Sequence, residues 1–268
     1  MNQKLHIYDS LFGHAKSTSL ENTPKYFQWE RSYNPDLIFF SDSHLHYVDQ
    51  INSKKKIAWL IETPSMSVYQ YQFILRNYEK FYKIFTHNKN LLENIKNTEL
   101  LPIGGCWINE QDQKIYDKNK NVSIIASGKN SFVGHMLRHE IISKIGGIDV
   151  FGFAYKKIDN KIEGLRDYKF SIVVENAKED YYFTEKIIDC FVTGTIPIYW
   201  GCPSIGNFFD VNGIISFDNI EELQSILNNL EGIYESKLES IKKNYDLSMQ
   251  YRVGDDLIYE KIKNEINN

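Results

Sequence analysis

Short apolar runs recur along the chain and alternate with longer stretches of helical periodicity. Apolar runs of this length predict strands buried on both faces, and a helix between consecutive strands makes them parallel. We expect strands at 5–8, 37–40, 57–61, 83–86, 100–103, 122–126, 148–152, 170–174, 196–200 and 214–217. We expect helices at 68–78, 90–97, 132–145, 183–192, 221–230 and 234–245. The alternation predicts an α/β fold with two Rossmann-like parallel-sheet domains, and such pairs bind ligands in the cleft that they face.

A polar stretch at 109–121, NEQDQKIYDKNKN, separates the two sets of strands. Its only large apolar residues are Ile115 and Tyr116, which favours an exposed linker. We therefore expect one domain at 1–120, a second at 121–250, and a charged helical tail at 251–268. The alternative is a long surface loop within a single domain.

The composition excludes several classes of protein. The 268 residues carry a formal net charge of -4, so no global basic field indicates nucleic acid as a partner. The three cysteines lack the spacing of metal ligands and predict buried apolar residues in a reducing compartment.

The chain shows neither a signal-peptide pattern at its N-terminus nor an apolar run long enough to span a membrane, so we expect a cytoplasmic protein. The absence of GxxxxGKS and GxGxxG elements argues against kinases and dinucleotide enzymes.

The stretch 168–203 is the most informative part of the chain for function. It predicts a strand, a polar loop, an amphipathic helix, a turn with glycine and a second strand. Lys186 lies in the first turn of this helix, where a cation opposes the helix dipole at a cost of about 0.3–1 kcal/mol when exposed. A bound anion offsets that cost, so the stretch predicts a site for a phosphorylated ligand at the carboxyl end of a sheet. The alternative is a solvated lysine paired with a nearby acid.

Three ordered motifs within this stretch carry a family resemblance. They are VEN at 174–176, YFTEK at 182–186 and GTIPIYWG at 194–201. In this order and spacing they resemble the signature block of the α1,3/α1,4-fucosyltransferases. A weaker likeness covers 127–152, where Arg138 occupies the position of an arginine that contacts the donor diphosphate in the family. Ser127, Gly128 and Lys129 follow a strand and could approach the nucleotide.

The resemblance implies a two-domain GT-B-type glycosyltransferase that transfers L-fucose from GDP-fucose with inversion, without a catalytic metal or any cofactor. Displacement at the anomeric carbon develops negative charge on the diphosphate, which cationic side chains can stabilise in place of a divalent ion. The resemblance gives the following residues roles in donor binding: Arg138 and Lys186 at the diphosphate, Glu185 at the ribose, and Glu175, Asn176 and Tyr182 at the nucleotide or its sugar.

Inversion also requires a base that accepts the proton of the acceptor hydroxyl. The run IAWLIETP at 57–64 brings Glu62 to the carboxyl end of a strand. Partial burial would raise the pKa of such a glutamate, which suits a base. Glu62 is our candidate, with Asp42 and His87, also at strand ends, as alternatives. A carboxylate that caps a helix or holds a loop is the structural alternative.

Other conspicuous side chains predict structure rather than function. We expect Trp59, Trp107 and Trp200 in the core rather than as sugar platforms. His135 and His139 lie four residues apart on a predicted helix, and we expect them at the surface or in contacts between domains.

The sequence therefore predicts a fucosyltransferase-like enzyme that acts on a glycan acceptor in the synthesis of a surface polysaccharide or other glycan. One alternative is a transferase that uses another GDP- or UDP-linked sugar. The other is a non-catalytic protein of the same fold that binds nucleotides or glycans. The chain shows no basic amphipathic tail, and the sequence leaves peripheral membrane contact, the acceptor and the oligomeric state open.

Overall fold

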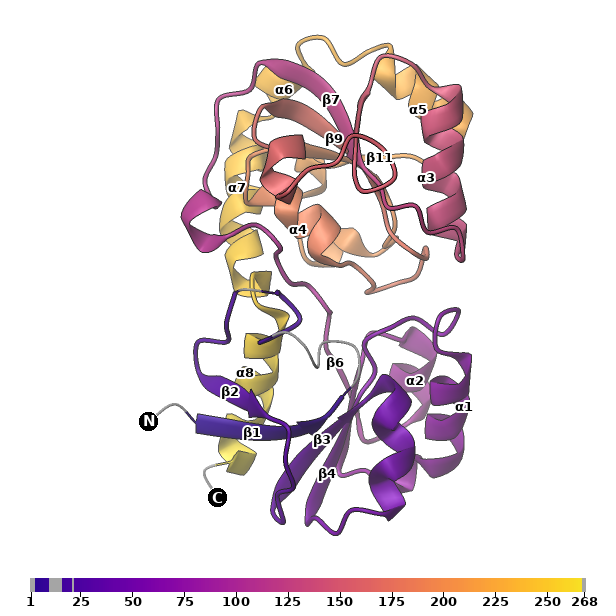
Figure 1. The fold of residues 1–268 in the computed structure, drawn as a ribbon, viewed down its shortest axis with the longest axis vertical. Coiled ribbons are helices and arrows are strands. Elements are labelled where there is room, and N and C mark those ends of the chain that lie inside the picture. The colour runs from indigo at the N-terminus through magenta and orange to yellow at the C-terminus, as the bar shows by residue number, and fades with distance from the viewer. Residues whose placement is uncertain (1–2, 10–15, 21, 267–268) are drawn as a thin grey trace. The chain divides into compact units, whose positions relative to one another are not determined.

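The computed structural model describes residues 3–9, 16–20 and 22–266 of the chain. The chain forms two compact α/β units. The first unit comprises Met1–Gly105, Glu179–Tyr182 and Val253–Asn268, and the second comprises Cys106–Lys178 and Phe183–Arg252. Each unit is built on one parallel sheet, as the alternation of apolar runs predicts (Figure 1).

Within the described residues, the first sheet has six strands in the order β2-β1-β3-β4-β5-β6, and all neighbours are parallel. The strands are β1 (Gln3–Tyr8), β2 (Phe27–Glu30), β3 (Leu37–Ser41), β4 (Lys55–Trp59), β5 (Lys83–Thr86) and β6 (Thr98–Leu100). The helices of this unit are α1 (Val68–Asn77), α2 (Lys89–Asn94) and α8 (Gly254–Ile266). Every strand but β2 overlaps a predicted apolar run. The sequence did not predict β2 because only two of its four residues, Phe27 and Trp29, are apolar.

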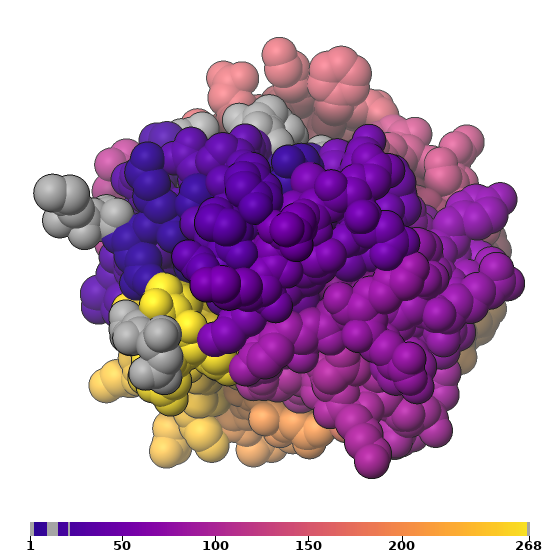
Figure 2. All heavy atoms as spheres, turned by 90° about the horizontal axis from the view of Figure 1, so that it is seen from below, coloured from indigo at the N-terminus to yellow at the C-terminus, as the bar shows by residue number. Residues whose placement is uncertain are grey.

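The two faces of the first sheet are covered by different helices. One face packs against α1 and α2 through a buried apolar cluster. The other face carries aromatic rings, in which the Trp29 centroid lies 5.2 Å from that of Phe39 and 6.1 Å from that of Trp59. On this face Trp29 Nε1 donates a hydrogen bond of 2.6 Å to the carboxylate of Asp255, at the start of α8. Figure 2 shows the yellow C-terminal residues against indigo and purple residues of the same unit.

The second sheet has five parallel strands in the part of the chain that the structure describes, in the order β11-β10-β9-β7-β8. The strands are β7 (Lys120–Ile125), β8 (Asp149–Phe151), β9 (Tyr168–Val174), β10 (Ile196–Trp200) and β11 (Ile215–Ser216). The helices are α3 (Val133–Lys144), α4 (Glu185–Phe191), α5 (Ile220–Leu227), α6 (Ile233–Ser236) and α7 (Leu238–Ser248). All five strands overlap predicted runs, and the predicted helix at 234–245 is divided at Lys237 into α6 and α7.

The core of the second unit follows the predicted pattern. One face of the sheet packs against α3, α5 and α6 in a single buried cluster. The helix α4 lies along β9 and β10 (Figure 1). Its predicted apolar stripe, Phe183, Ile187 and Phe191, is buried. The loops that follow β7, β8 and β9 therefore meet the start of α4 at the carboxyl edge of this sheet.

The two units divide the chain differently from the expected boundary at residue 120. Residues 106–120 belong to the second unit because they bond to it: the backbone N–H of Trp107 donates to Asp189, and the Lys118 ammonium donates to the carbonyl oxygens of Leu165 and Thr193. The stretch expected as a linker is thus a long loop within that unit. Residues 254–266 of the expected tail form the helix α8, which belongs to the first unit.

Two further expectations can be compared with the structure. All three cysteines are buried and free, as expected. In the described part of the chain, no helix combines the length and apolar character needed to cross a membrane.

Candidate functional site

A cavity of about 340 Å³ lies at the carboxyl edge of the second sheet. It is lined by residues that follow β7, β8 and β9, together with side chains from α3 and α4. Loop residues at this edge of a parallel sheet commonly bind ligands. Four of the predicted donor-binding residues line the cavity: Arg138, Asn176, Glu185 and Lys186. Ser127 and Lys129 line it as well.

Arg138 is fixed against the end of β9. Its Nε–H donates a hydrogen bond of 3.1 Å to the carbonyl oxygen of Val174, and its Nη2 donates one of 2.8 Å to Oδ1 of Asn176. The arginine is buried, with an exposed fraction of 6%. These contacts hold a permanent positive charge at the cavity wall and orient the Asn176 side chain.

The position of Arg138 depends on the close approach of α3 to the end of β9. A Cβ atom on Gly134, in the first turn of α3, would lie 1.7 Å from the carbonyl oxygen of Glu175. Gly134→Ala is therefore expected to displace α3 and to lower the free energy of unfolding by about 1–3 kcal/mol or more. Thermal unfolding would measure the loss.

Gly146→Ala is the matched control for this substitution. A Cβ atom on Gly146 would meet no heavy atom within 4 Å, so the alanine there should be neutral or slightly stabilising. Equal stability of the two variants would show that α3 does not depend on contact with the Glu175 carbonyl.

Lys186 and Glu175 form an ion pair at one side of the cavity. Lys186 Nζ lies 3.3 Å from Oε2 of Glu175 and 2.9 Å from Oγ1 of Thr184. Glu175 is fully buried, and its carboxylate also accepts hydrogen bonds from the backbone N–H and the hydroxyl of Thr184. Glu175 is not among the residues that line the cavity, so the structure places it behind Lys186. Its direct contact with a nucleotide stays a prediction.

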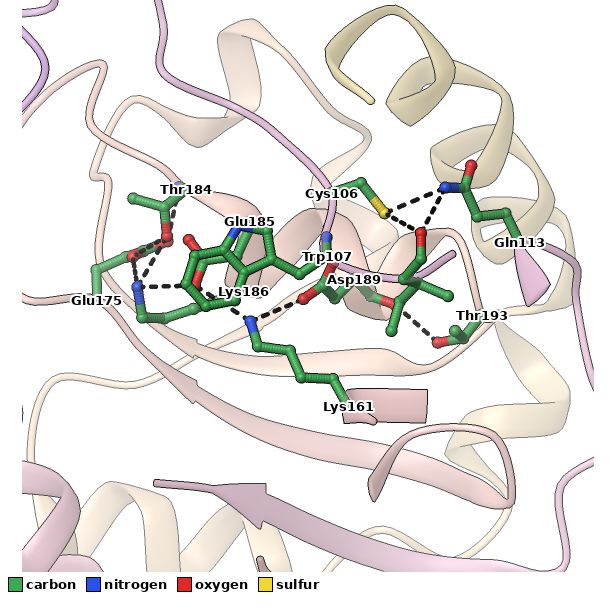
Figure 3. A network of polar contacts seen from close by, with 11 residues as sticks. Cys106, Trp107, Gln113, Lys161, Glu175, Thr184, Glu185, Lys186, Asp189 and Thr193 are labelled. Atoms are coloured by element: carbon green, nitrogen blue, oxygen red, sulfur yellow. Dashed lines mark hydrogen bonds and ion pairs between the residues drawn. The ribbon is translucent and has the colours of Figure 1, made fainter. Parts of the chain in front are cut away.

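Glu185 is held between two lysines. Lys161 Nζ lies 3.2 Å from Oε1 of Glu185, and Lys186 Nζ lies 3.6 Å from the same oxygen (Figure 3). Burial alone would raise the pKa of Glu185, but Lys161, Lys186 and Thr184 together lower it to about 2. Glu185 is therefore ionised at neutral pH and presents an acceptor at the cavity wall, which suits a contact with hydroxyl groups.

Lys161 is a component of the site that the sequence analysis did not identify. Its Nζ also lies 2.9 Å from Oδ2 of Asp189 and 4.2 Å from the centroid of the Trp107 ring (Figure 3). Burial opposes its charge, but Asp189 and Glu185 raise the pKa of Lys161. Lys161, Asp189 and Trp107 all line the cavity. Lys161 begins a short 3-10 helix, Lys161–Gly164, in a polar stretch whose sequence does not distinguish it from its neighbours.

Two of the expectations for aromatic and histidine side chains were wrong. Trp59 and Trp200 are buried as expected. Trp107 is 40% exposed and lines the cavity, where the Lys161 ammonium lies over its ring. His135 is buried and lines the cavity, because the first turn of α3 rests against the end of β9. His139 bonds to the Tyr155 hydroxyl and to the carbonyl oxygen of Lys129.

Tyr182 does not line the cavity. Its side chain is 1% exposed, and its ring centroid lies 5.1 Å from that of His87 within the first unit. Its predicted place beside the nucleotide or its sugar is therefore not visible in the structure and stays a prediction.

The three candidate bases lie at the carboxyl edge of the first sheet, following β3, β4 and β5. Asp42 Oδ1 accepts hydrogen bonds from the backbone N–H groups of Ile61 and Glu62, at 3.2 and 3.4 Å. Burial and the neighbouring Glu62 raise the pKa of Asp42 to about 8. Burial lowers the pKa of His87 to about 3, and its ring is fully buried. Glu62 is only partly buried, which makes it the most accessible of the three.

No cluster of three or more His, Cys, Asp or Glu side chains that could hold a metal ion occurs among residues 3–9, 16–20 and 22–266. At the cavity, Glu185 and Asp189 instead form ion pairs with Lys161 and Lys186.

Comparisons with known proteins agree with this architecture. A family model described as glycosyltransferase family 10 (fucosyltransferase), C-terminal part, matches residues 115–264. An α-(1,3)-fucosyltransferase of Helicobacter pylori is 26% identical over 144 residues, which are 52% of this chain and 30% of that protein. The GDP-fucose protein O-fucosyltransferase 3 of Rattus norvegicus is 34% identical over 82 residues, or 28% of this chain and 17% of that protein. The matches thus span less than a third of these relatives.

Solved structures share the fold over most of the chain. A crystal structure of an α1,3-fucosyltransferase superposes with a TM-score of 0.62 and 19% identity, over 97% of this chain and 90% of that chain. An α-glucosyltransferase in complex with UDP and DNA gives a TM-score of 0.54 at 12% identity, over 85% and 79% of the two chains. The two parallel-sheet units are therefore those of the expected GT-B-like fold. Because the family model matches more than half of its residues, the chain belongs to glycosyltransferase family 10, the fucosyltransferases.

Proposed function

We propose that this protein transfers L-fucose from GDP-fucose to a hydroxyl group of a glycan acceptor, with inversion at the anomeric carbon. The observation that carries the proposal is the cavity at the second sheet, where Arg138, Lys186 and Lys129 gather positive charge beside the ionised Glu185. A nucleotide diphosphate with a ribose matches this combination. Family membership supports the same donor, as do related crystal structures described as complexes with GDP and with GDP-fucose.

The cations at the cavity would stabilise the leaving group. As the bond from the anomeric carbon to the phosphate oxygen breaks, negative charge grows on the diphosphate. Arg138 and Lys186, placed beforehand by their protein contacts, would interact with that charge more strongly in the transition state than in the bound donor. We propose that these fixed cations stabilise the diphosphate leaving group, as a divalent ion does in other transferases.

Glu62 is the proposed base. It would accept the proton of the acceptor hydroxyl as the oxygen attacks the anomeric carbon. The structure supports Glu62 over its alternatives because His87 is fully buried and Asp42, at neutral pH, already holds a proton. We further propose a role in cytoplasmic glycan synthesis.

The donor specificity can be tested by thermal shift. GDP-fucose and GDP are expected to raise the melting temperature, because a ligand that binds only the folded state stabilises it. GDP-mannose and UDP-sugars at equal concentration should give smaller shifts. Stabilisation by UDP-sugars alone would reassign the donor.

A transfer assay completes this test. Release of GDP from GDP-fucose should depend on a glycan acceptor and should keep its rate in EDTA. Loss of activity in EDTA, restored by Mn²⁺, would refute the metal-independent mechanism. Nucleotide binding without transfer to any acceptor in a broad panel would favour a non-catalytic binding protein.

A further inference from the structure

One residue of the donor cavity, His135, has no role in the mechanism above. It lies in the first turn of α3, three residues before Arg138, so the two side chains share a face of the helix. His135 lines the cavity and is only 5% exposed. Its Nδ1 atom is buried and has no hydrogen-bond partner in the structure. Buried polar atoms are rarely left without a partner. Because His135 lines the cavity and one of its ring nitrogens is unpaired, the imidazole is available to a bound ligand.

The charges that face His135 are mostly positive. Arg138 and His139 come from its own helix, Lys129 from the loop after β7, and Lys186 from α4. The two acids beside Lys186 are already in ion pairs: Glu175 pairs with Lys186, and Glu185 pairs with Lys186 and Lys161. Burial and the neighbouring cations lower the pKa of His135 to about 4. Without a ligand, the ring is therefore neutral at physiological pH.

Resting on the proposed function, we propose that His135 takes up a proton from solvent when the diphosphate of the nucleotide sugar binds, and donates a hydrogen bond to a phosphate oxygen. A diphosphate among Arg138, Lys129 and Lys186 would cancel the repulsion that keeps the ring neutral. It would also supply the acceptor that a protonated ring requires. On release of the nucleotide the proton returns to solvent. His135 is then a cation only while the diphosphate is present, unlike Arg138.

The sign of the pH effect follows from linkage. The ring has a pKa of about 4 without ligand and a higher one in the complex. Between the two values, binding consumes up to one proton, so the affinity falls by as much as about tenfold for each unit of rising pH. Above the pKa of the complex the affinity no longer changes with pH.

Calorimetry with GDP-fucose can detect this proton. Both phosphates of the nucleotide sugar are esterified and do not titrate near neutrality, whereas a terminal phosphate, as in GDP, would, with a pKa near 6. The binding enthalpy is measured at pH 5.5, 6.5 and 7.5 in two buffers of different ionisation enthalpy. The wild-type protein should take up at least about half a proton at pH 5.5 and 6.5, and its affinity should fall at least about tenfold from pH 5.5 to 7.5.

Two variants locate the proton. His135→Asn should bind GDP-fucose without proton uptake and with an affinity that varies less than about threefold over this range. His139→Asn, one turn further along α3, is the matched control and should keep the wild-type uptake. Proton uptake that persists in His135→Asn would overturn the inference, as would a wild-type protein that binds without uptake.

The outcome also separates this inference from the proposed function. Binding of GDP-fucose with no proton uptake leaves the donor assignment intact and removes only the role of His135, whereas no binding at all refutes both. If His135→Asn does not fold, NMR signals of the histidine rings in the wild-type protein can show whether a histidine gains a proton when GDP-fucose binds. One ring must gain a proton on addition of GDP-fucose at pH 6.5, and unchanged rings would refute the inference.

Discussion

Replacing Glu62 with glutamine is expected to lower the rate of fucose transfer by about a hundredfold to ten-thousandfold, the usual contribution of a positioned acid or base. Glutamine has nearly the same shape but cannot accept the proton of the acceptor hydroxyl. Donor binding should remain, because the predicted donor contacts of Arg138, Glu185 and Lys186 are made in the second unit. The decrease should therefore appear in kcat, with little change in the Kd for GDP-fucose.

The control for this substitution is Glu93→Gln, an exposed glutamate on α2 of the same unit. It makes the same chemical change outside the strand-end group and should leave transfer unchanged. If Glu62→Gln stays active while Asp42→Asn loses activity, the role of base moves to Asp42. Because the pKa of Asp42 is about 8, Asp42 would have to lose its proton before it could act as the base. Asp42 and Glu62 would then titrate as a coupled pair during turnover.

Replacing Lys186 with methionine is expected to weaken GDP-fucose binding at least tenfold, or about 1.4 kcal/mol. The methionine keeps the length of the side chain and removes the charge. The affinity falls because a charge-assisted hydrogen bond to the diphosphate disappears. The substitution also removes the ion pair between Lys186 and the buried Glu175 carboxylate. Titration calorimetry would measure the affinity. Arg138→Ala should act in the same direction.

Lys169→Met is the charge-matched control for Lys186→Met. Lys169 lies on β9, pairs with Glu235 and is not among the residues that line the cavity. Its substitution should leave the affinity within about twofold of the wild-type value, as expected for a solvent-screened surface ion pair. An unchanged affinity in Lys186→Met, with melting temperature preserved, would contradict a role for Lys186 at the diphosphate.

The sequence predicted the parts of the molecule that depend on local pattern. The strands were found because parallel strands buried on both faces are apolar throughout. Arg138, Asn176, Glu185 and Lys186 could be proposed from the sequence because each belongs to a motif or a helix with a recognisable context. The structure brings these four together around one cavity.

The remaining site residues were not predictable because tertiary structure places them. Lys161 is one of several lysines in a polar stretch, and only folding puts it between Glu185 and Asp189. Trp107 and His135 were expected elsewhere because large apolar or helical residues give no sign of facing a cavity. Glu175 was assigned to the ligand from its motif. The structure shows its buried carboxylate bonded to Thr184, and a contact with the nucleotide stays a prediction.

The division of the chain into units has a consequence for the order in which the protein is made. The first unit is completed by α8, whose Asp255 accepts hydrogen bonds from Thr18 and Trp29 and whose Glu265 pairs with Lys83. The ribosome synthesises α8 only after every residue of the second unit. The second unit, although later in the sequence, can therefore finish folding first. Until α8 is made, the aromatic face of the first sheet remains exposed to solvent. A fragment that ends at residue 105 would keep that face exposed and is expected to aggregate.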